Sequence, residues 1–284
     1  MSLLAIGSLL LASLIWGWSF PATKDLIENI HPLWVNVFTF GISGLIFVII
    51  ALITKQRILF RLKQGIVLGI LITLVETPQI LGLSLTSSSN TALITGVGIL
   101  LAPLFESFYK RTLPQKKYLL TLFLGFIGLS LITGGISSIV PGDILVFICA
   151  IFLGLYIFST DLFEHKNKSS LVSLCAQQFL TISIISFILV LIFQVPLNLT
   201  TLQTYSKELF LIMLFPTLFA YFLEDFGQKK VNIITASFLL VLEPVFGAFF
   251  SVLLAEDTFS VMKLLGSVIL IFSIALSILH KKRA

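Results

Sequence analysis

Charged side chains are scarce in this chain of 284 residues: they make up 11% of the sequence, whereas hydrophobic residues make up 57%. Globular proteins contain about 25% charged and roughly 45–50% apolar residues. A chain with so few polar side chains cannot cover a surface that faces water, so the composition excludes a soluble fold. It indicates a protein whose solvent is the lipid bilayer.

Enzyme signatures are missing as well. The sequence has no HExxH metal motif, no GxSxG elbow and no P-loop, which excludes a zinc protease, a serine hydrolase and an ATP-driven pump within this chain. Its three histidines, His31, His165 and His280, fall in loops or at the ends of apolar runs. The two cysteines, Cys149 and Cys175, fall inside apolar runs and are interpreted as small buried side chains. We therefore predict no enzymatic activity, no metal and no cofactor.

Ten apolar runs, each about as long as a membrane-spanning helix, divide the chain. The first run has no basic segment before it and no cleavage pattern before Lys24, so we interpret it as a retained span and not as a signal peptide. The sequence thus predicts an all-α membrane protein with ten transmembrane helices at residues 3–23, 33–53, 65–85, 91–109, 117–134, 144–161, 171–194, 208–227, 233–254 and 262–279.

The loops between these runs differ in basic charge. Only Lys24, Lys207 and Lys263 fall on one side, whereas the other 15 of the 18 basic residues fall on the opposite side. Cytoplasmic loops carry the excess of Lys and Arg, so both termini are predicted to be cytoplasmic, in the inner membrane of a bacterium. The net charge of +5 then reflects topology and requires no nucleic-acid partner. The fifteen are Lys55, Arg57, Arg61, Lys63, Lys110, Arg111, Lys116, Lys117, Lys166, Lys168, Lys229, Lys230, Lys281, Lys282 and Arg283.

A weak internal repeat divides the chain into residues 1–140 and 141–284. At an offset of 141 residues, Leu101, Pro103, Phe105, Phe108, Leu113, Leu124 and Gly125 match Leu242, Pro244, Phe246, Phe249, Leu254, Leu265 and Gly266. The first spans of the two halves match less well, with Ala12, Trp18 and Phe20 facing Ala150, Tyr156 and Phe158. Each half holds five predicted helices, an odd number, so the second half must cross the membrane in the opposite sense. Inverted repeats of this kind are typical of secondary transporters, whose substrate site lies near the midplane.

Three stretches resemble a known family: the run LASLIWGWSF at 11–20, the stretch GLSLTSSSNTALITG at 82–96, and the run LEPVF at 242–246 followed by Ala255-Glu256. They resemble EamA-type carriers of the drug/metabolite transporter superfamily, over nearly the whole chain. The resemblance implies ten helices around a central cavity and transport of small metabolites, often the export of amino acids or nucleobase-like compounds. Thr39 stands where many relatives carry an arginine, which leaves the second span without an anion-binding side chain.

Few ionisable residues lie inside the predicted spans, and each is a candidate for function because it is costly to place in lipid. Glu76 and Glu243 lie about midway along their spans, and Glu224 lies nearer a span end. Without a cationic partner, a buried carboxylate is protonated or holds a bound cation. Glu76, Glu243 and Glu224 are therefore the candidates for proton coupling. The alternative is a structural role, in which protonated Glu76 forms a hydrogen bond between two helices and Glu243 forms hydrogen bonds with backbone groups freed by Pro244.

Polar and aromatic side chains at helical spacing add candidates. Thr217, Tyr221, Glu224 and Gln228 fall on one face of the eighth span, and Glu76 and Gln79 share a face of the third. Trp16, Trp18 and Tyr156 occupy the first spans of the two halves, deep enough to stack on a flat or cationic substrate or to serve in packing. The predicted substrate cavity comprises Trp16, Trp18, Glu76, Gln79, Tyr156, Thr217, Tyr221 and Glu243.

We therefore expect a secondary transporter that moves a small polar metabolite (an amino acid, an amine or a nucleobase-like compound), as an exporter, by alternating access and with proton coupling. One alternative is an uptake or exchange carrier for a cationic nucleoside-like metabolite such as S-adenosylmethionine. Another is a membrane receptor or assembly subunit that does not transport. The expected partners are the small-molecule substrate and the lipid bilayer, with the choice between monomer and homodimer left open.

Overall fold

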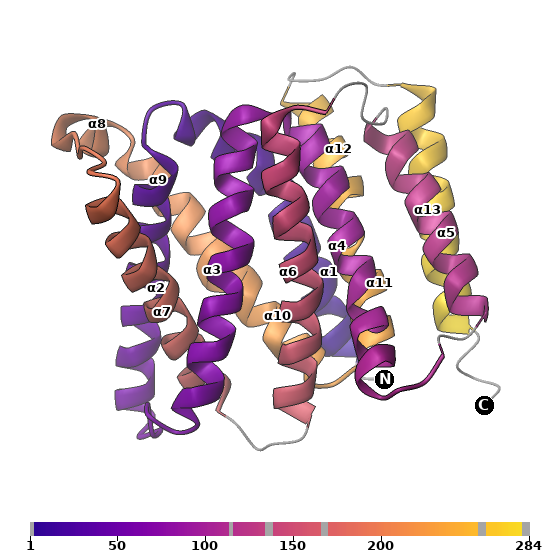
Figure 1. Cartoon of the computed structure of the whole chain (residues 1–284), viewed down its shortest axis with the longest axis horizontal. Helices are drawn as coiled ribbons and strands as arrows, with labels where there is room; N and C mark the ends of the chain where they lie inside the picture. The colour runs from indigo at the N-terminus through magenta and orange to yellow at the C-terminus, as the bar shows by residue number, and fades with distance from the viewer. Residues whose placement is uncertain (1–2, 114–115, 134–138, 166–169, 255–259, 280–284) are drawn as a thin grey trace.

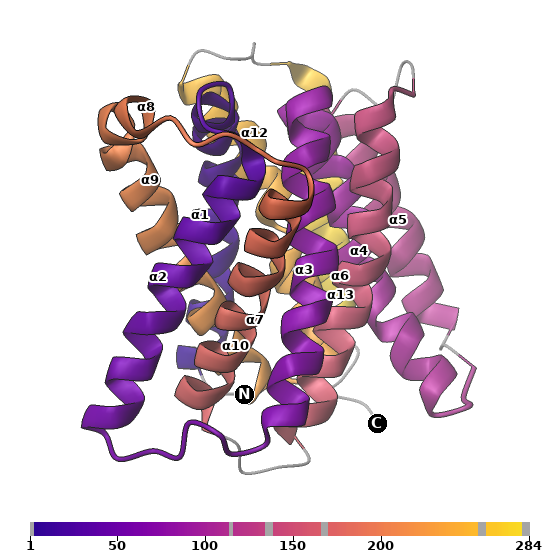
Figure 2. The ribbon, with the colours of Figure 1, turned by 60° about the vertical axis from the view of Figure 1, so that its left-hand side comes forward.

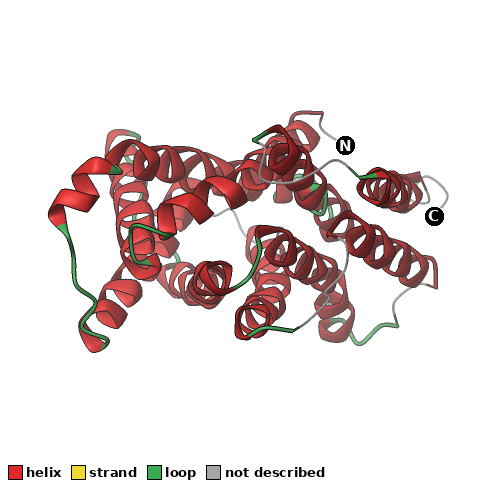
Figure 3. Cartoon of the chain, turned by 90° about the horizontal axis from the view of Figure 1, so that it is seen from above, coloured by secondary structure: helices red, strands yellow, loops and turns green. Residues whose placement is uncertain are grey.

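The structure of the chain, a computed structural model, describes residues 3–113, 116–133, 139–165, 170–254 and 260–279. This part of the chain contains helices and connecting loops and no strand (Figure 3), so the predicted all-α fold is confirmed there. Several residues named above lie outside the described residues, or have side chains that do: Lys117, His165, Lys166, Lys168, Ala255, Glu256, Lys263, His280, Lys281, Lys282 and Arg283.

Seven helical stretches in the described residues are long and apolar enough to cross a membrane. They are formed by α1 (Leu3–Ile27), α2 (Pro32–Ile53), α3 (Leu62–Leu85), α4 (Ser88–Tyr109), α6 (Pro141–His165), α7 (Leu171–Ile192) and a continuous run of α9 (Ser206–Ile212), η1 (Met213–Ala220) and α10 (Tyr221–Gln228). A short helix, α8 (Leu199–Thr204), precedes α9.

Three further apolar stretches are helical but shorter: Tyr118–Leu131, Ile233–Gly247 and Leu264–Ser273. They belong to α5 (Lys116–Thr133), to α11 (Ile233–Leu240) with α12 (Glu243–Leu253), and to α13 (Val261–Leu279). Each coincides with one of the ten predicted spans, so every predicted run is mostly helical where it is described. That all ten cross the membrane stays a prediction.

The long helices lie side by side between two ends of a bundle (Figures 1 and 2). We call the end where α1 begins at Leu3 the near end, and the end where α1 ends at Ile27 the far end. α13 ends at the near end, where the loops from α2 to α3, from α4 to α5 and from α10 to α11 also lie (Figure 1). α5 and α13 pair along one edge of the bundle, whereas α2 packs on α7 at the opposite side.

Glycines allow α6 to approach both α3 and α4 at backbone distance. A Cβ atom added at Gly142 would lie 2.7 Å from the carbonyl oxygen of Gly82 on α3, and one added at Gly154 would lie 2.9 Å from the carbonyl oxygen of Gly98 on α4. Any larger side chain would clash, so these contacts hold three helices together through their main chains.

The ninth predicted span is interrupted in its middle. α11 ends at Leu240, a turn follows at residues 241–242, and α12 begins at Glu243. Pro244 has no N–H to donate to the carbonyl of Leu240, and its ring would clash with that group in a regular helix. The Ser13 hydroxyl of α1 instead donates to the carbonyls of Leu239 (2.9 Å) and Leu240 (3.5 Å). A side chain from a neighbouring helix thus satisfies the backbone that the proline frees.

The eighth predicted span also departs from a regular α-helix, because residues Met213–Ala220 form a π-helix around Pro216. The carbonyl of Ile212 accepts from the Thr217 hydroxyl (3.1 Å), and the carbonyl of Pro216 accepts from the indole nitrogen of Trp16 on α1 (3.0 Å). Such π-segments often mark functional sites. Here the segment is held by α1, the same helix that supports the break between α11 and α12.

Candidate substrate cavity

A cavity of about 90 Å³ lies among the helices. It is lined by α1, α2, α3, α4, α6, η1 and α10 and by the adjoining ends of α9, α11 and α12. Its lining on α2 is Val35–Phe40 and its lining on α3 is Val75–Leu83, so it lies toward the far end of the bundle. Pockets for drug-sized ligands measure roughly 300–1,000 Å³, so this conformation has room for water or a small head group.

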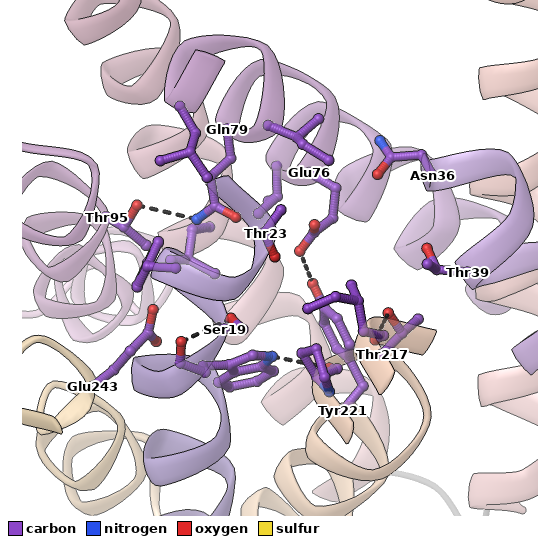
Figure 4. Close-up of a pocket in the computed structure, with 18 of the residues that line it drawn as sticks. Ser19, Thr23, Asn36, Thr39, Glu76, Gln79, Thr95, Thr217, Tyr221 and Glu243 are labelled. Carbon is purple, nitrogen blue, oxygen red and sulfur yellow. Dashed lines mark hydrogen bonds between the residues drawn. The ribbon is translucent and has the colours of Figure 1, made fainter. Parts of the chain in front are cut away.

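Three carboxylates face the cavity from three different elements. Glu76 comes from α3 and Glu243 is the first residue of α12 (Figure 4). Glu224 comes from α10. Glu76 accepts a short hydrogen bond from the hydroxyl of Tyr221. Glu224 is 1% exposed and accepts from the amide of Gln228 at 2.7 Å. The carbonyl of Leu240, which Pro244 leaves without its backbone donor, lies 3.5 Å from the hydroxyl of Ser13, and Glu243 lines the cavity.

Tyr221 lies at the centre of an aromatic group on the near side of the cavity. Its ring packs edge-on with those of Trp16, Phe40, Phe179 and Tyr156, at centroid distances of 5.1, 5.9, 5.7 and 6.3 Å. Edge-to-face aromatic pairs are directional contacts worth about 0.5–1.5 kcal/mol each beyond area burial. The phenolic hydroxyl that binds Glu76 is therefore held in a fixed position.

Neutral hydrogen-bonding groups complete the wall. The amide of Gln79 donates to the hydroxyl of Thr95 (3.1 Å), and Ser19, Thr23 and Asn36 also line the cavity (Figure 4). Asn36 is 2% exposed, and its amide nitrogen has no partner in the described residues. A buried donor without a partner inside a cavity wall is suited to binding water or a polar ligand.

The structure brings together six of the eight predicted cavity residues: Trp16, Glu76, Gln79, Thr217, Tyr221 and Glu243. It does not place Trp18 or Tyr156 on the cavity wall. Trp18 packs edge-on against Phe215 at 6.2 Å, and the hydroxyl of Tyr156 donates to Gln178 at 3.3 Å. Glu224 lies four residues before the end of α10, near a span end as predicted, and it is buried and lines the cavity.

Sequence reasoning missed the contribution of α2 and α4. Asn36, Thr39 and Ser43 are spaced three and four residues apart, which puts a polar stripe on one face of the second span. All three are buried, and the first two line the cavity. The same period-based argument that found Thr217 and Tyr221 applies to this stripe. Thr91 and Thr95, four residues apart and both buried, give α4 a similar but shorter polar face.

No lysine, arginine or histidine is among the described residues that line the cavity. Lys24, next to the lining residue Thr23, uses its ammonium group elsewhere: it donates to the carbonyls of Leu83 (2.5 Å) and Thr86 (2.9 Å) at the end of α3. Cations are favourable at the C-terminal end of a helix. The hydroxyl of Thr86 in turn donates to Asp143 at the start of α6 (2.6 Å). The charged residues at the far end therefore join helices and leave the cavity acidic.

A bundle of apolar helices with an interrupted helix, a π-segment and an acidic cavity inside it is typical of membrane transporters. The comparisons with known proteins specify which one. The EamA-like transporter family matches residues 3–134 and again residues 140–279, so the chain belongs to this family, within the drug/metabolite transporter superfamily.

Relatives and solved structures agree with this assignment. The chain is 25% identical over 266 residues to an uncharacterized transporter of Archaeoglobus fulgidus, covering 94% of this chain and 83% of that protein. It is 28% identical over 165 residues to the uncharacterized transporter YrdR of Bacillus subtilis, covering 53% and 51% of the two chains. A protein of known crystal structure has the same fold, with a TM-score of 0.78 over 98% of both chains at 18% sequence identity.

Proposed function

We propose that the protein carries a small amine-bearing metabolite across the membrane by alternating access through this cavity. The observation that supports the proposal is the charge of the wall: Glu76, Glu224 and Glu243 face the cavity, and none of its described lining residues is cationic. Carboxylates buried in a membrane protein are stable when they are protonated or paired with a cation. An ammonium group fits both requirements, since it neutralises a carboxylate and donates hydrogen bonds to it.

The proposal includes proton coupling and export. In the empty cavity protons occupy the carboxylates, and a cationic amine displaces them when it binds. An exchange of amine for proton uses the proton gradient to drive the amine outward. The residues proposed to carry the proton are Glu76, Glu243 and Glu224. The aromatic surfaces of Trp16 and Tyr221 are suited to stack on the apolar part of the substrate or on its charge.

The topology that we propose has ten crossings, in two inverted repeats at 1–140 and 141–284, with the near end in the cytoplasm of a bacterial cell. Two separate family matches, at 3–134 and 140–279, support the repeats. The near end carries Lys55, Arg57, Arg61, Lys63, Lys110, Arg111, Lys116, Lys229 and Lys230, whereas the far end carries Lys24 and Lys207 among the described residues. Topology reporters fused in the loops after Thr54 and after Phe193 should report cytoplasm and exterior, respectively; the reverse would refute the orientation.

The test of function begins with a panel of amines, amino acids and nucleosides added to the purified protein. A ligand at 100 times its Kd stabilises the fold by about 2.7 kcal/mol, which thermal unfolding detects. The compound that stabilises is then used in counterflow into proteoliposomes at several pH values. Glu76→Gln with Glu243→Gln should abolish binding and the pH dependence of transport. Glu208→Gln, an exposed carboxylate on α9, is the control and should change neither.

Each result has a defined meaning. Transport that keeps its rate and pH dependence in the double variant would refute the role of these carboxylates. Binding without counterflow would identify a receptor and not a carrier. Stabilisation by anions and not by amines would refute the proposed substrate class.

A further inference from the structure

A fourth buried carboxylate lies behind the cavity and takes no part in lining it. Asp225 follows Glu224 on α10, is 2% exposed, and is absent from the cavity wall. Its Oδ2 atom accepts from the thiol of Cys175 (3.3 Å) and from the amide of Gln178 (3.2 Å), both on α7. The amide oxygen of the same glutamine, Oε1 of Gln178, accepts from the hydroxyl of Tyr156 on α6 (3.3 Å).

The second oxygen of this carboxylate has no partner. Oδ1 of Asp225 is buried and receives no hydrogen bond from any described residue, and the same is true of Oε2 of Glu224. The donors that do reach Asp225, a thiol and an amide, are both neutral. A carboxylate that is sealed from water and bonded on one oxygen by neutral donors is not stable as a permanent anion. The unpartnered oxygen is where a proton binds.

Few titratable groups face Asp225 from the elements packed around α10. α7 contributes Cys175. α6 contributes Tyr156 and, five residues further toward its near end, carries Asp161, while η1 and α11 carry no titratable residue. The titratable residues of α1, Lys24 and Asp25, lie in its last turn at the far end. On α10 itself the neighbours are Tyr221 and Glu224, and Lys229 and Lys230 follow the end of the helix. Among these groups Glu224 is the adjacent carboxylate, and two neighbouring negative charges in a low-dielectric site repel each other.

We propose that Asp225 is a proton-binding site of the carrier, sharing one proton with Glu224 and separated from the substrate path. This inference rests on the proposed function, because it supplies a place for the proton that the amine displaces. Two interacting carboxylates without a cation hold one proton between them, since both cannot be charged in a low-dielectric site.

The charge balance follows from the position of the two residues. When an amine reaches Glu224, the O–H bond at Glu224 breaks, an O–H bond forms at Asp225, and the negative charge moves to the cavity side of α10. When the amine leaves at the far end, Glu224 takes up a proton from that side and Asp225 releases its proton toward the near end, so one proton moves inward for each amine that moves outward. Cys175 lies within the first turns of α7, which begins at Leu171 at the near end, so Asp225 lies between the cavity and that end.

Cys175 provides a built-in reporter of this proton, because its thiol donates to Asp225. The chain has two cysteines, so Cys149→Ala leaves Cys175 as the single thiol. The infrared S–H stretch of that thiol shifts when its acceptor changes from a carboxylate to a neutral acid. We expect the band of the full-length Cys149→Ala protein in lipid to move between two positions as the pH is changed, and to stay fixed when Asp225→Asn is added.

Two further variants complete the test. Glu224→Gln removes the repelling charge, so the transition should move by about one pH unit to lower pH. Glu106→Gln, whose carboxylate pairs with Lys110 at the near end of α4, should leave the transition unchanged. If Asp225→Asn does not fold, the shift in the Glu224→Gln protein decides: its presence supports a shared proton, and its absence refutes it.

A band that does not move with pH, or that moves equally in Asp225→Asn, would overturn the inference. The measurement requires no transport, so its failure is distinct from failure of the proposed function, which appears as absence of counterflow.

Discussion

Replacing Gly17 by alanine should destabilise the protein and displace Glu243, because the contact between α1 and α12 has no room for a methyl group. A Cβ atom at Gly17 would lie 2.6 Å from Cβ of Phe246, 2.7 Å from the backbone nitrogen of Gly247 and 2.9 Å from the carbonyl oxygen of Glu243. Two of these atoms belong to the main chain of α12, so no side chain can rotate away to relieve the clash.

The size of the effect can be estimated from these distances. Ordinary contacts between carbon atoms lie at about 3.5–4.0 Å, so α1 and α12 must separate by about 1 Å. Overpacking of this kind costs about 1–3 kcal/mol. Alanine in a helix gains up to about 1 kcal/mol over glycine, which partly offsets the cost. The matched control is Gly7→Ala in the same helix, where nothing lies within 4 Å of the added methyl. The helix gain is common to both variants, so their difference in stability isolates the packing cost, about 1–3 kcal/mol.

The assay uses the two buried cysteines. Cys149 and Cys175 are both 0% exposed, so a maleimide fluorophore reacts with them only as the protein unfolds. We expect Gly17→Ala to unfold several degrees below Gly7→Ala and to bind the amine ligand more weakly, since Glu243 moves with α12. Equal unfolding temperatures in the two variants would show that α1 and α12 do not approach at backbone distance, and would refute the reasoning.

Two other predictions concern a backbone break and a helix start. Ser13→Ala removes the donor to the carbonyls of Leu239 and Leu240 and should lower the free energy of unfolding by about 0.6–1.7 kcal/mol. The hydroxyl of Ser13 also bonds within α1, to the carbonyl of Leu9 (2.9 Å). Ser8→Ala removes a bond of that second kind alone among the described residues, to the carbonyl of Ala5 (2.9 Å), and should change the free energy less; equal effects would contradict the role of Ser13. Burial lowers the pKa of His31, whose Nδ1 accepts from the backbone of Leu33 (3.2 Å) at the start of α2. The folded state thus resists protonation of His31, so its contribution to stability is complete above the unfolded pKa of about 6.5 and is lost as the pH falls below that value. In His31→Asn, which keeps an acceptor without a titrating group, thermal unfolding should lose this pH dependence. An unchanged pH profile in His31→Asn would refute the role of His31.

The helices of this protein could be predicted from the sequence because length and apolarity alone determine them. Every predicted run is mostly helical where it is described, and seven helical stretches are long and apolar enough to cross a membrane. The irregular backbone could not be predicted in the same way. Pro244 and Pro216 show where a helix can break, but whether it does depends on partners such as Ser13 and Trp16, which come from the other end of the chain.

The candidate site could be predicted in part, because the free-energy cost of placing a carboxylate in lipid makes every carboxylate inside a predicted span a candidate for function. That argument found Glu76 and Glu243, and helical spacing found Tyr221 and Thr217. Neither argument could decide which side of a helix faces the cavity. Tyr156 and Trp18 lie at suitable depth but point elsewhere, and Glu224 lies inside the cavity because α10 is tilted into the bundle and not aligned with its edge.

The glycine contacts of α6 have a mechanical consequence. α6 begins the second half of the sequence, yet its main chain is fitted against α3 and α4 of the first half at Gly82 and Gly98. A motion that separated the two halves at this place would have to break the backbone contacts of α6 with α3 and α4, and the van der Waals packing between these helices would be lost. For the transport cycle proposed above, we therefore expect α3, α4 and α6 to move as one body and the hinge to lie in the irregular segments around Pro216 and between α11 and α12.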